Sequence, residues 1–401
     1  MSCTYRLFFS VDEINFDDWN TVPGVHENAF MQDGFMRAVE ISMRATTKCC
    51  YAIFYDAKQT PVACACYSRY VVDGAELAPG RVQQMIQSVQ RIVPPAFKFK
   101  VLLCGLPVST GSSNLVVAPD ADMTAVTQAM DAAAKELAHK FGCVYVAFKE
   151  FDQALADRLQ PLQGLGYQRA TSVITYVLDS EFTSFDDYYK SRSKRTRANM
   201  RKVLSKFDST GLRCEFLQGK AALERLQDSR VHELYMAVFR RSDMKFEVVP
   251  PEFFQELARQ LPEQSRFTLL YRGDTLVAFC CGVQLNPKHL NLLYCGVDYD
   301  LNVEADLYFN LLYKALEDSF TAGATRLFVG QSADEFKQRL GCVGSPRFIY
   351  IKALSTLVSP LRAPIFRRVF PLVFKEPDFS KLHPVKDEQE AVPTDSPAAK
   401  V

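Results

Sequence analysis

Apolar and polar positions alternate most regularly in the second half of the chain, between Phe267 and Gln331. Three runs with a two-residue period, separated by polar turns that contain Gly273 and Pro287, are typical of strands in a β-meander. These runs are Phe267–Tyr271, Leu276–Leu285 and His289–Val297. A helical pattern from about Asn302 to Thr321 and an apolar run at Arg326–Val329 follow. This order predicts an α/β domain with a mixed, largely antiparallel sheet flanked by helices.

A weaker copy of the same order lies in the first half. In both halves a tyrosine, a polar turn, Val-Ala and a cysteine follow one another, at Tyr55–Cys64 and at Tyr271–Cys280. The helical pattern Met123–Phe141 then matches the later helix, and each copy ends with a strand, expected at Arg169–Leu178 and at Arg347–Lys352. The repeat predicts two tandem domains, residues 1–180 and 181–375, and a polar tail at 376–401 that we expect to be disordered.

The start of the second predicted domain carries a dense positive charge. Eight basic residues and no acidic residue lie between Lys190 and Lys206. Apolar residues recur there at helical spacing: Met200, Val203, Leu204 and Phe207. The segment is therefore predicted to be an amphipathic helix whose apolar face is docked and whose basic face points outward.

The whole chain does not share this charge. It has 47 Lys and Arg against 46 Asp and Glu, a net charge of +1. No global field then draws the protein to nucleic acid or to an anionic membrane, so we expect no DNA binding and only local electrostatic contacts.

The cysteines indicate buried thiols rather than disulfides or a metal site. The chain has 12 cysteines, which are adjacent, alternate or scattered in apolar runs, with no Cys-x-x-Cys spacing. There is also no secretory signal and no apolar run long enough to cross a bilayer. We expect a cytoplasmic protein with no bound metal.

Several short motifs occur together in the second half. They are Tyr189-x3-Ser193-x3-Arg197, the hairpin residues Val277-Ala278, the strand that ends near Tyr294, and Gly330-x5-Phe336-Lys337-x2-Leu340-Gly341. In this combination the chain resembles the GNAT-superfamily acyltransferases of the FemAB-like type, which are often built as tandem GNAT domains. The resemblance implies a transferase that forms an amide from an acyl or aminoacyl donor and an amine. It implies acyl-CoA as co-substrate in some members and aminoacyl-tRNA in others, with no bound cofactor.

One segment departs from the GNAT pattern. GNAT domains usually bind the CoA pyrophosphate with a glycine-containing loop at the start of the long helix. Here the segment Asp298–Asp306 has no glycine and four carboxylates, which stabilise a helix start but repel a phosphate. A carrier-bound or tRNA-linked donor therefore stays open beside acyl-CoA.

Amide formation requires a proton acceptor, a group that stabilises the oxyanion and a proton donor for the leaving group. Asp298, directly after the central strand, is the first candidate for general base and Glu304 the second; both could instead be helix-start carboxylates. Tyr294 could protonate the leaving group or be a core tyrosine.

Further candidates follow the last strand. The resemblance places Lys337 at a conserved lysine position of FemAB-like proteins, where a cation could stabilise the oxyanion or bind a phosphate, unless it is a solvated helix lysine. Gln331 and Ser332 offer polar groups and N–H donors to the same cleft.

The basic helix has three interpretations. It could be a solvated face, it could contact the phosphates of a carrier or tRNA donor through residues such as Arg197 and Arg201, or it could attach to an anionic membrane together with Leu361–Phe374. The sequence thus predicts an N-acyltransferase acting on a small amine or amino-acid-like acceptor. Two alternatives are an aminoacyl-tRNA-dependent transferase and a non-catalytic binding protein of the same fold.

Overall fold

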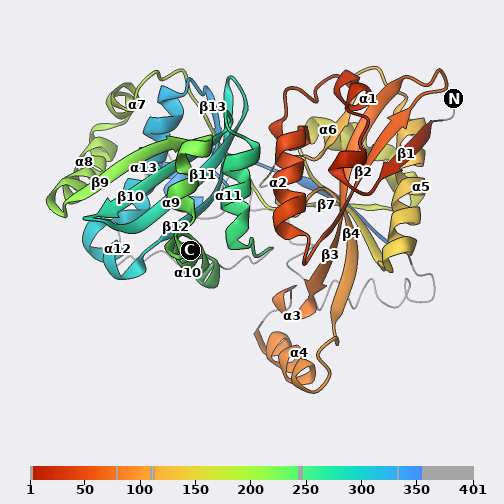
Figure 1. Ribbon diagram of the computed structural model, residues 1–401, viewed down its shortest axis with the longest axis horizontal. Coiled ribbons are helices and arrows are strands. Elements are labelled where there is room, and N and C mark those ends of the chain that lie inside the picture. Colours follow the sequence, from red (N-terminus) through yellow and green to blue (C-terminus); the bar gives the residue numbers. More distant parts are fainter. Residues whose placement is uncertain are drawn as a thin grey trace. The chain divides into compact units, whose positions relative to one another are not determined.

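A computed structural model describes residues 3–77, 80–108, 111, 113–242, 247–331 and 334–354. The expected tail at 376–401 and the segment 361–374 lie outside this part of the chain. Two compact units are formed, each around one mixed sheet (Figure 1). The first comprises Met1–Ile174 and a segment that begins at Pro346, and the second runs from Thr175 to Ser345.

The sheet of the first unit has the order β1-β2-β3-β4-β6-β15-β7, with β5 paired to β3. Neighbouring strands are antiparallel except β4 and β6, which are parallel. The strands are β1 (Thr4–Phe8), β2 (Lys48–Tyr55), β3 (Pro61–Asp73), β4 (Lys98–Cys104), β5 (Leu115–Val117), β6 (Tyr145–Phe151), β7 (Gln168–Thr171) and β15 (Phe348–Ala353). The α-helices are α1 (Phe16–Thr21), α2 (Asp33–Met43), α3 (Gly74–Leu77), α4 (Gly80–Ile92), α5 (Met123–Phe141) and α6 (Gln153–Arg158).

Burial on both faces explains why β2 is almost entirely apolar. Ala52 and Phe54 belong to the core that α5 covers. The alternate residue Tyr51 packs edge-on against Trp19 of α1, with ring centroids 6.4 Å apart. The two faces of the strand are therefore filled by different helices.

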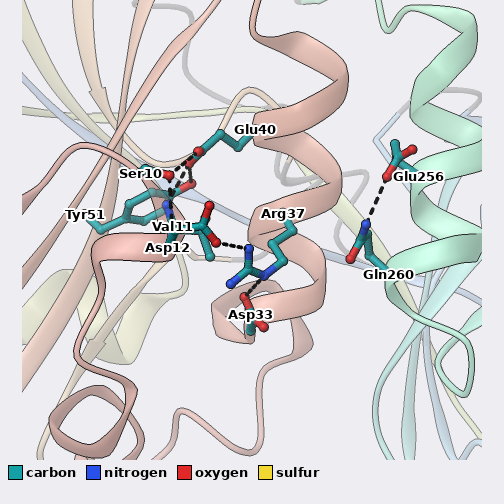
Figure 2. A network of polar contacts seen from close by, with 9 residues as sticks. All are labelled: Ser10, Val11, Asp12, Asp33, Arg37, Glu40, Tyr51, Glu256 and Gln260. Carbon is teal, nitrogen blue, oxygen red and sulfur yellow. Dashed lines mark hydrogen bonds and ion pairs between the residues drawn. The ribbon is translucent and has the colours of Figure 1, made fainter.

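Glu40 of α2 links the segment after β1 to strand β2 through hydrogen bonds (Figure 2). Its carboxylate accepts hydrogen bonds from Ser10 Oγ at 2.8 Å, Val11 N at 3.0 Å and the Tyr51 hydroxyl at 2.8 Å. Figure 2 also shows Gln260 donating to Glu256 at 3.1 Å, a contact within one helix of the second unit. These contacts stabilise local structure.

The sheet of the second unit has the order β14-β8-β13-β12-β11-β10-β9, and only β12 and β13 are parallel. The strands are β8 (Thr175–Asp179), β9 (Leu212–Gln218), β10 (Ser265–Arg272), β11 (Thr275–Asn286), β12 (His289–Val297), β13 (Arg326–Phe328) and β14 (Val343–Ser345). The helices are α7 (Phe185–Ser191), α8 (Lys194–Ser209), α9 (Leu223–Leu226), α10 (Ser229–Arg241), α11 (Pro251–Gln260), α12 (Tyr299–Ala305), α13 (Leu307–Thr321) and α14 (Asp334–Arg339).

One predicted strand is in fact two strands of different sheets. The run expected at Arg169–Leu178 forms β7 in the first sheet and β8 in the second, where β8 lies between β13 and β14. In return β15, near the C-terminal end of the described chain, lies between β6 and β7 in the first sheet. The single-strand prediction was wrong because an apolar run does not show which strands it will pair with.

The predicted fold class is confirmed: the chain forms two tandem α/β units with mixed, mostly antiparallel sheets. The helical run expected at about Asn302–Thr321 is interrupted, because Asp306 adopts a left-handed conformation with φ 46° and ψ 47° between α12 and α13. This break lies beside the candidate site.

Candidate active site

The second sheet opens between β12 and β13. The two strands pair only at His289–Asn291 and Arg326–Phe328, although β12 continues to Val297. Beyond Phe328 the chain stays with β8, since Val329 N donates to Tyr176 O at 2.8 Å and Tyr176 N donates to Gly330 O at 3.0 Å. We call the region past this divergence the β12–β13 opening. The carboxyl ends of parallel strands are where open α/β sheets bind their ligands.

A β-bulge distorts β12 at the opening. Cys281 of β11 faces Tyr294, but the next residue, Gly282, faces Leu292, so Leu293 is an additional residue in β12. A bulge bends its strand and turns backbone groups away from the regular ladder, and bulges are frequent beside active sites. The distortion and the divergence therefore occur at the same place.

Lys337 of α14 reaches into this opening. Its side chain is buried, with 3% exposure, so it is not a solvated helix lysine. The ammonium Nζ lies 5.9 Å from the ring centroid of Tyr176, and a Cβ at Gly330 would stand 3.3 Å from it. Burial raises the pKa of Cys295 to about 11, and the charge of Lys337 opposes this rise. The ammonium group thus lies at Gly330, just past the end of β13, and its charge acts on Cys295 of β12.

Tyr294 and Cys295 are adjacent in β12 and therefore point to opposite faces of the sheet. Since the charge of Lys337 acts on Cys295, Tyr294 lies on the face away from Lys337. Its ring packs against Tyr235 of α10 and Phe253 of α11, with centroid distances of 5.6 and 5.9 Å. The Tyr294 hydroxyl donates a hydrogen bond to the Glu247 carboxylate. Burial first, and then the charge of Glu247, hold the pKa of Tyr294 well above its ordinary value. The phenol is therefore protonated at physiological pH.

Glu247 is a carboxylate that the sequence did not single out. Its backbone is fixed by Tyr235, whose hydroxyl donates to Glu247 O at 3.2 Å and accepts from Val249 N at 3.3 Å. A single glutamate a few residues before α11 gives no signal in the sequence. The hydrogen bond from Tyr294 is what marks it as part of the site.

Asp298 is already engaged by protein groups. It caps α12, accepting a hydrogen bond from Asp300 N at 3.0 Å, and it forms an ion pair with Arg230 of α10. The ion pair and the capping hydrogen bond hold this carboxylate at the start of α12. Asp298 thus has a structural role at the start of the helix.

Two other acids of this segment are also paired with cations. Glu304 pairs with Arg272 at 3.2 Å, with 54% of its side chain exposed, and Asp306 pairs with Lys206 of α8 at 2.8 Å. Three of the four carboxylates between Asp298 and Asp306 therefore face a cation. Their repulsion of a phosphate group is weaker than the sequence alone suggested.

The residues predicted to bind the donor do not lie in one cluster. Gln331 follows β13 and its Nε2 donates to Thr175 Oγ1 at 3.3 Å, while Ser332 lies outside the described residues. Arg197 donates to the backbone oxygens of Lys190 and Arg192 at 3.1 and 2.6 Å. Its guanidinium thus stabilises the junction between α7 and α8.

The predicted basic helix is α8, and it retains exposed cations. Arg201 is exposed and donates to the Tyr189 hydroxyl at 3.3 Å, and Lys194 and Lys202 are exposed as well. Met200 alone is fully buried among the apolar residues named above, and the other three are half-buried. The helix therefore has the docked apolar face and the outward basic face that its sequence predicts.

The same junction supports the helix that carries Lys337. Tyr188 donates its hydroxyl to Leu340 O at 3.0 Å, and Arg192 Nη1 donates to the same oxygen at 3.4 Å. These two donors satisfy a carbonyl group at the C-terminal end of α14. The basic segment and the candidate site are therefore physically connected.

The residues do not suggest a metal centre. Among the described residues, no group of three or more His, Cys, Asp or Glu side chains is arranged to hold an ion. The chemistry that this arrangement can perform is polar: a buried cation on one face of β12, and a tyrosine and carboxylate pair on the other.

Comparison with known proteins identifies the family. A family profile for FemAB-like proteins, described as peptidoglycan biosynthesis/recognition, matches residues 10–343. A search of the curated proteins found no match.

Solved structures show the same fold. FemX aligns with a TM-score of 0.55 and 12% identity, covering 89% of this chain and 99% of FemX. The C-terminal DUF2156 domain of an Agrobacterium fabrum protein named as a lysylphosphatidylglycerol synthetase aligns at 0.51 and 12%, covering 90% and 98%. At such identities the likeness concerns the fold.

The family profile spans most of the chain and covers residues of both units described above. The resemblance that the sequence motifs indicated is confirmed. The chain belongs to the FemAB-like family.

Proposed function

We propose that the second unit forms an amide by transferring an activated acyl group to an amine at the β12–β13 opening. The observation that supports this most directly is the buried ammonium group of Lys337 at Gly330, just past the point where β13 leaves β12. Acyl transfer passes through a tetrahedral intermediate with a negative charge on the former carbonyl oxygen. A fixed cation shielded from water stabilises such a charge far better than a solvated one.

The two faces of β12 suggest a division of roles. The amine nitrogen attacks the carbonyl carbon of a thioester or ester, a C–N bond forms, and the bond to the sulfur or oxygen of the leaving group breaks. Glu247, oriented by the Tyr294 hydroxyl, accepts the proton that the amine loses. Lys337, on the opposite face, stabilises the oxyanion and then the leaving group.

Asp298 and Glu304 take a secondary place in this mechanism, because Arg230 and Arg272 already neutralise them. We propose that Gln331, which follows β13, lines the donor side of the opening. The acceptor in this proposal is a small amine or amino-acid-like molecule.

The main donor in this proposal is an acyl-CoA or a carrier-bound acyl group. A second candidate function, aminoacyl transfer from tRNA, is favoured by one observation. The exposed cations of α8 belong to the segment whose Arg192 contacts the end of α14. In this second candidate, α8 binds the phosphates of the tRNA through exposed cations such as Arg201. The same segment contacts the end of α14, the helix that carries Lys337. A binding protein without catalysis is the third possibility.

The change Lys337→Met tests the proposal, since it keeps the length of the side chain and removes its charge. We expect a loss of kcat/KM of about 100-fold or more in amide formation, followed by mass spectrometry with acyl-CoA or aminoacyl-tRNA as donor. Lys288→Met, in the exposed turn before β12, is the matched control. Full activity in a folded Lys337→Met protein would refute the role proposed for this residue.

The donor is identified by binding. Thermal stabilisation by CoA thioesters would support the first candidate. Binding of tRNA that weakens with salt and is lost in Arg201→Glu would support the second. If neither donor binds and no amide forms, the third possibility is favoured.

A further inference from the structure

Part of the first unit extends beyond its sheet. β2 pairs with β3 only as far as Arg69, and β6 pairs with β4 only from Val101 onward, but β3 and β4 stay paired to Asp73 and Lys98. The resulting two-stranded ribbon carries α3 and α4 at its end, away from the rest of the unit (Figure 1). We call this ribbon with its two helices the β3–β4 arm.

The helix α4 at the end of the arm has an uncovered apolar face. Met85, Val89 and Ile92 follow one another at helical spacing and are exposed by 59%, 37% and 84%. Ile86, on the neighbouring side of the helix, is buried at 1%. The arm thus covers only one side of the apolar stripe of α4, and the side with Met85, Val89 and Ile92 stays exposed.

The turn after α4 continues this character. Val93 is 48% exposed and Phe97 is 41% exposed. Phe97 has a φ of 60°, a conformation that bulky residues avoid. It is held by hydrogen bonds from Gly74 N to Phe97 O at 2.8 Å and from Lys98 N to Pro95 O at 3.2 Å. An unfavourable backbone conformation is therefore maintained at a position that exposes an aromatic ring, which points to function.

The charged residues of α4 and of the segment that follows it are all basic. Between Gly80 and Lys100 there are four basic residues and no acidic residue, and Arg81, Arg91 and Lys98 are exposed. Asp73, the last residue of β3, accepts hydrogen bonds from Ala75 N at 2.9 Å and Gln90 Nε2 at 2.8 Å. In a chain with a net charge of +1, this is a local concentration of positive charge.

We propose that the β3–β4 arm docks on a bilayer that contains anionic lipids, with the apolar face of α4 in the headgroup boundary and its basic residues on the lipid phosphates. An apolar stripe bordered by Arg and Lys is the pattern of helices that lie in the membrane interface. Pairing of two copies through α4 fits less well, because symmetry would place the same basic residues opposite each other. No described helix is long and apolar enough to span the membrane, so the contact is interfacial.

The test is cosedimentation of the full chain with vesicles of phosphatidylcholine containing phosphatidylglycerol. We expect binding that weakens with salt and with the removal of phosphatidylglycerol. The double variant Met85→Ser with Ile92→Ser should lower the partition coefficient about tenfold or more, because it removes two large apolar side chains. Val303→Ser, at an apolar helix position that is 75% exposed in the second unit, should leave it unchanged.

The depth of insertion gives an independent measurement. Ile92→Trp should be quenched by brominated lipids, whereas the natural Trp19, which is fully buried, should not. Absence of vesicle binding at low salt, or binding that the Met85 and Ile92 double variant retains, would overturn the proposal. Dimerisation without lipid that the same double variant abolishes would also overturn it and would assign the face to a second copy.

Discussion

At the scale of single residues, the position of Lys337 depends on the glycine at 330. Gly330 has a φ of 88°, and a Cβ there would stand 3.3 Å from Lys337 Nζ. We predict that Gly330→Ala costs about 1 kcal/mol of stability from backbone strain, and that it also moves the ammonium group and lowers kcat. Thermal unfolding and steady-state kinetics measure the two effects separately.

Gly323 provides the matched control for this change. Its φ is 77°, but no atom lies within 4 Å of a Cβ built there. Gly323→Ala should therefore lose a similar amount of stability and keep its kcat. Equal kcat values for the two variants would show that the contact with Lys337 has no catalytic importance.

Glu247 and Asp298 separate two interpretations of the proton acceptor. We predict that Glu247→Gln lowers kcat about 100-fold and that Tyr294→Phe, which removes only the orienting hydroxyl, lowers it about tenfold. Asp298→Asn should mainly reduce stability, by at most about 1 kcal/mol, because asparagine still caps the helix but no longer pairs its charge with Arg230. A large kcat loss in Asp298→Asn alone would return the role of base to that residue.

At the scale of elements, a buried ion pair fixes β15 in the first sheet. Asp131 of α5, 5% exposed, accepts hydrogen bonds from Lys352 Nζ of β15 at 2.9 Å and from the Tyr167 hydroxyl at 3.0 Å. Lys135 pairs with its other oxygen at 2.6 Å. This ion pair thus joins β15 to a helix that precedes it in the sequence, and the paired residues are 221 positions apart.

This network predicts a pH dependence of stability. Burial alone would raise the pKa of Asp131, but the hydrogen bonds from Lys135, Lys352 and Tyr167 lower it below its ordinary value. A depressed carboxyl pKa stabilises the fold above the unfolded pKa and loses this effect as pH falls. Asp131→Asn should therefore cost about 3 kcal/mol near neutral pH and progressively less below about pH 4, measured by urea unfolding.

A double-mutant cycle with Lys352→Met checks that the pair is responsible. The two changes together should cost less than the sum of the single changes, because neither charge is then left buried alone. Additive effects would mean that Asp131 acts independently of β15.

The sequence predicted helices and strands with a regular apolar period, but it did not predict which strands pair or which side chains meet. The helix α5 and the strand β12 have the predicted ends, because capping by Asp122 and Gly142 and an uninterrupted alternation are local signals. The exchange of β8 and β15 is a choice of partner strand, which local pattern does not encode. For the same reason Lys337 was found by its motif, whereas its burial and the contact between Glu247 and Tyr294 required the folded chain.

At the scale of the whole molecule, the exchange of strands makes the units unequal in sequence. All strands of the second sheet lie within Thr175–Ser345, a continuous segment. The first sheet needs β15, which begins at Phe348, between β6 and β7. A boundary at 180 would leave β8 with the first half, although both of its partner strands belong to the second.

This arrangement predicts which fragments fold. Residues 175–345 should give cooperative unfolding by circular dichroism, while residues 181–345 should not, because β13 and β14 lose the strand that joins them.

Residues 3–174 should be unstable alone and should gain structure when a peptide of residues 346–354 is added. Trp19 fluorescence gives the signal, since Trp19 is fully buried and donates to Met31 O at 2.8 Å in the intact unit. A peptide in which Tyr350 is replaced by Asp should have no effect, because it cannot enter the core or donate to Ala156 O as Tyr350 does at 2.7 Å. Independent folding of residues 3–174 without the peptide would show that β15 is dispensable to the first sheet.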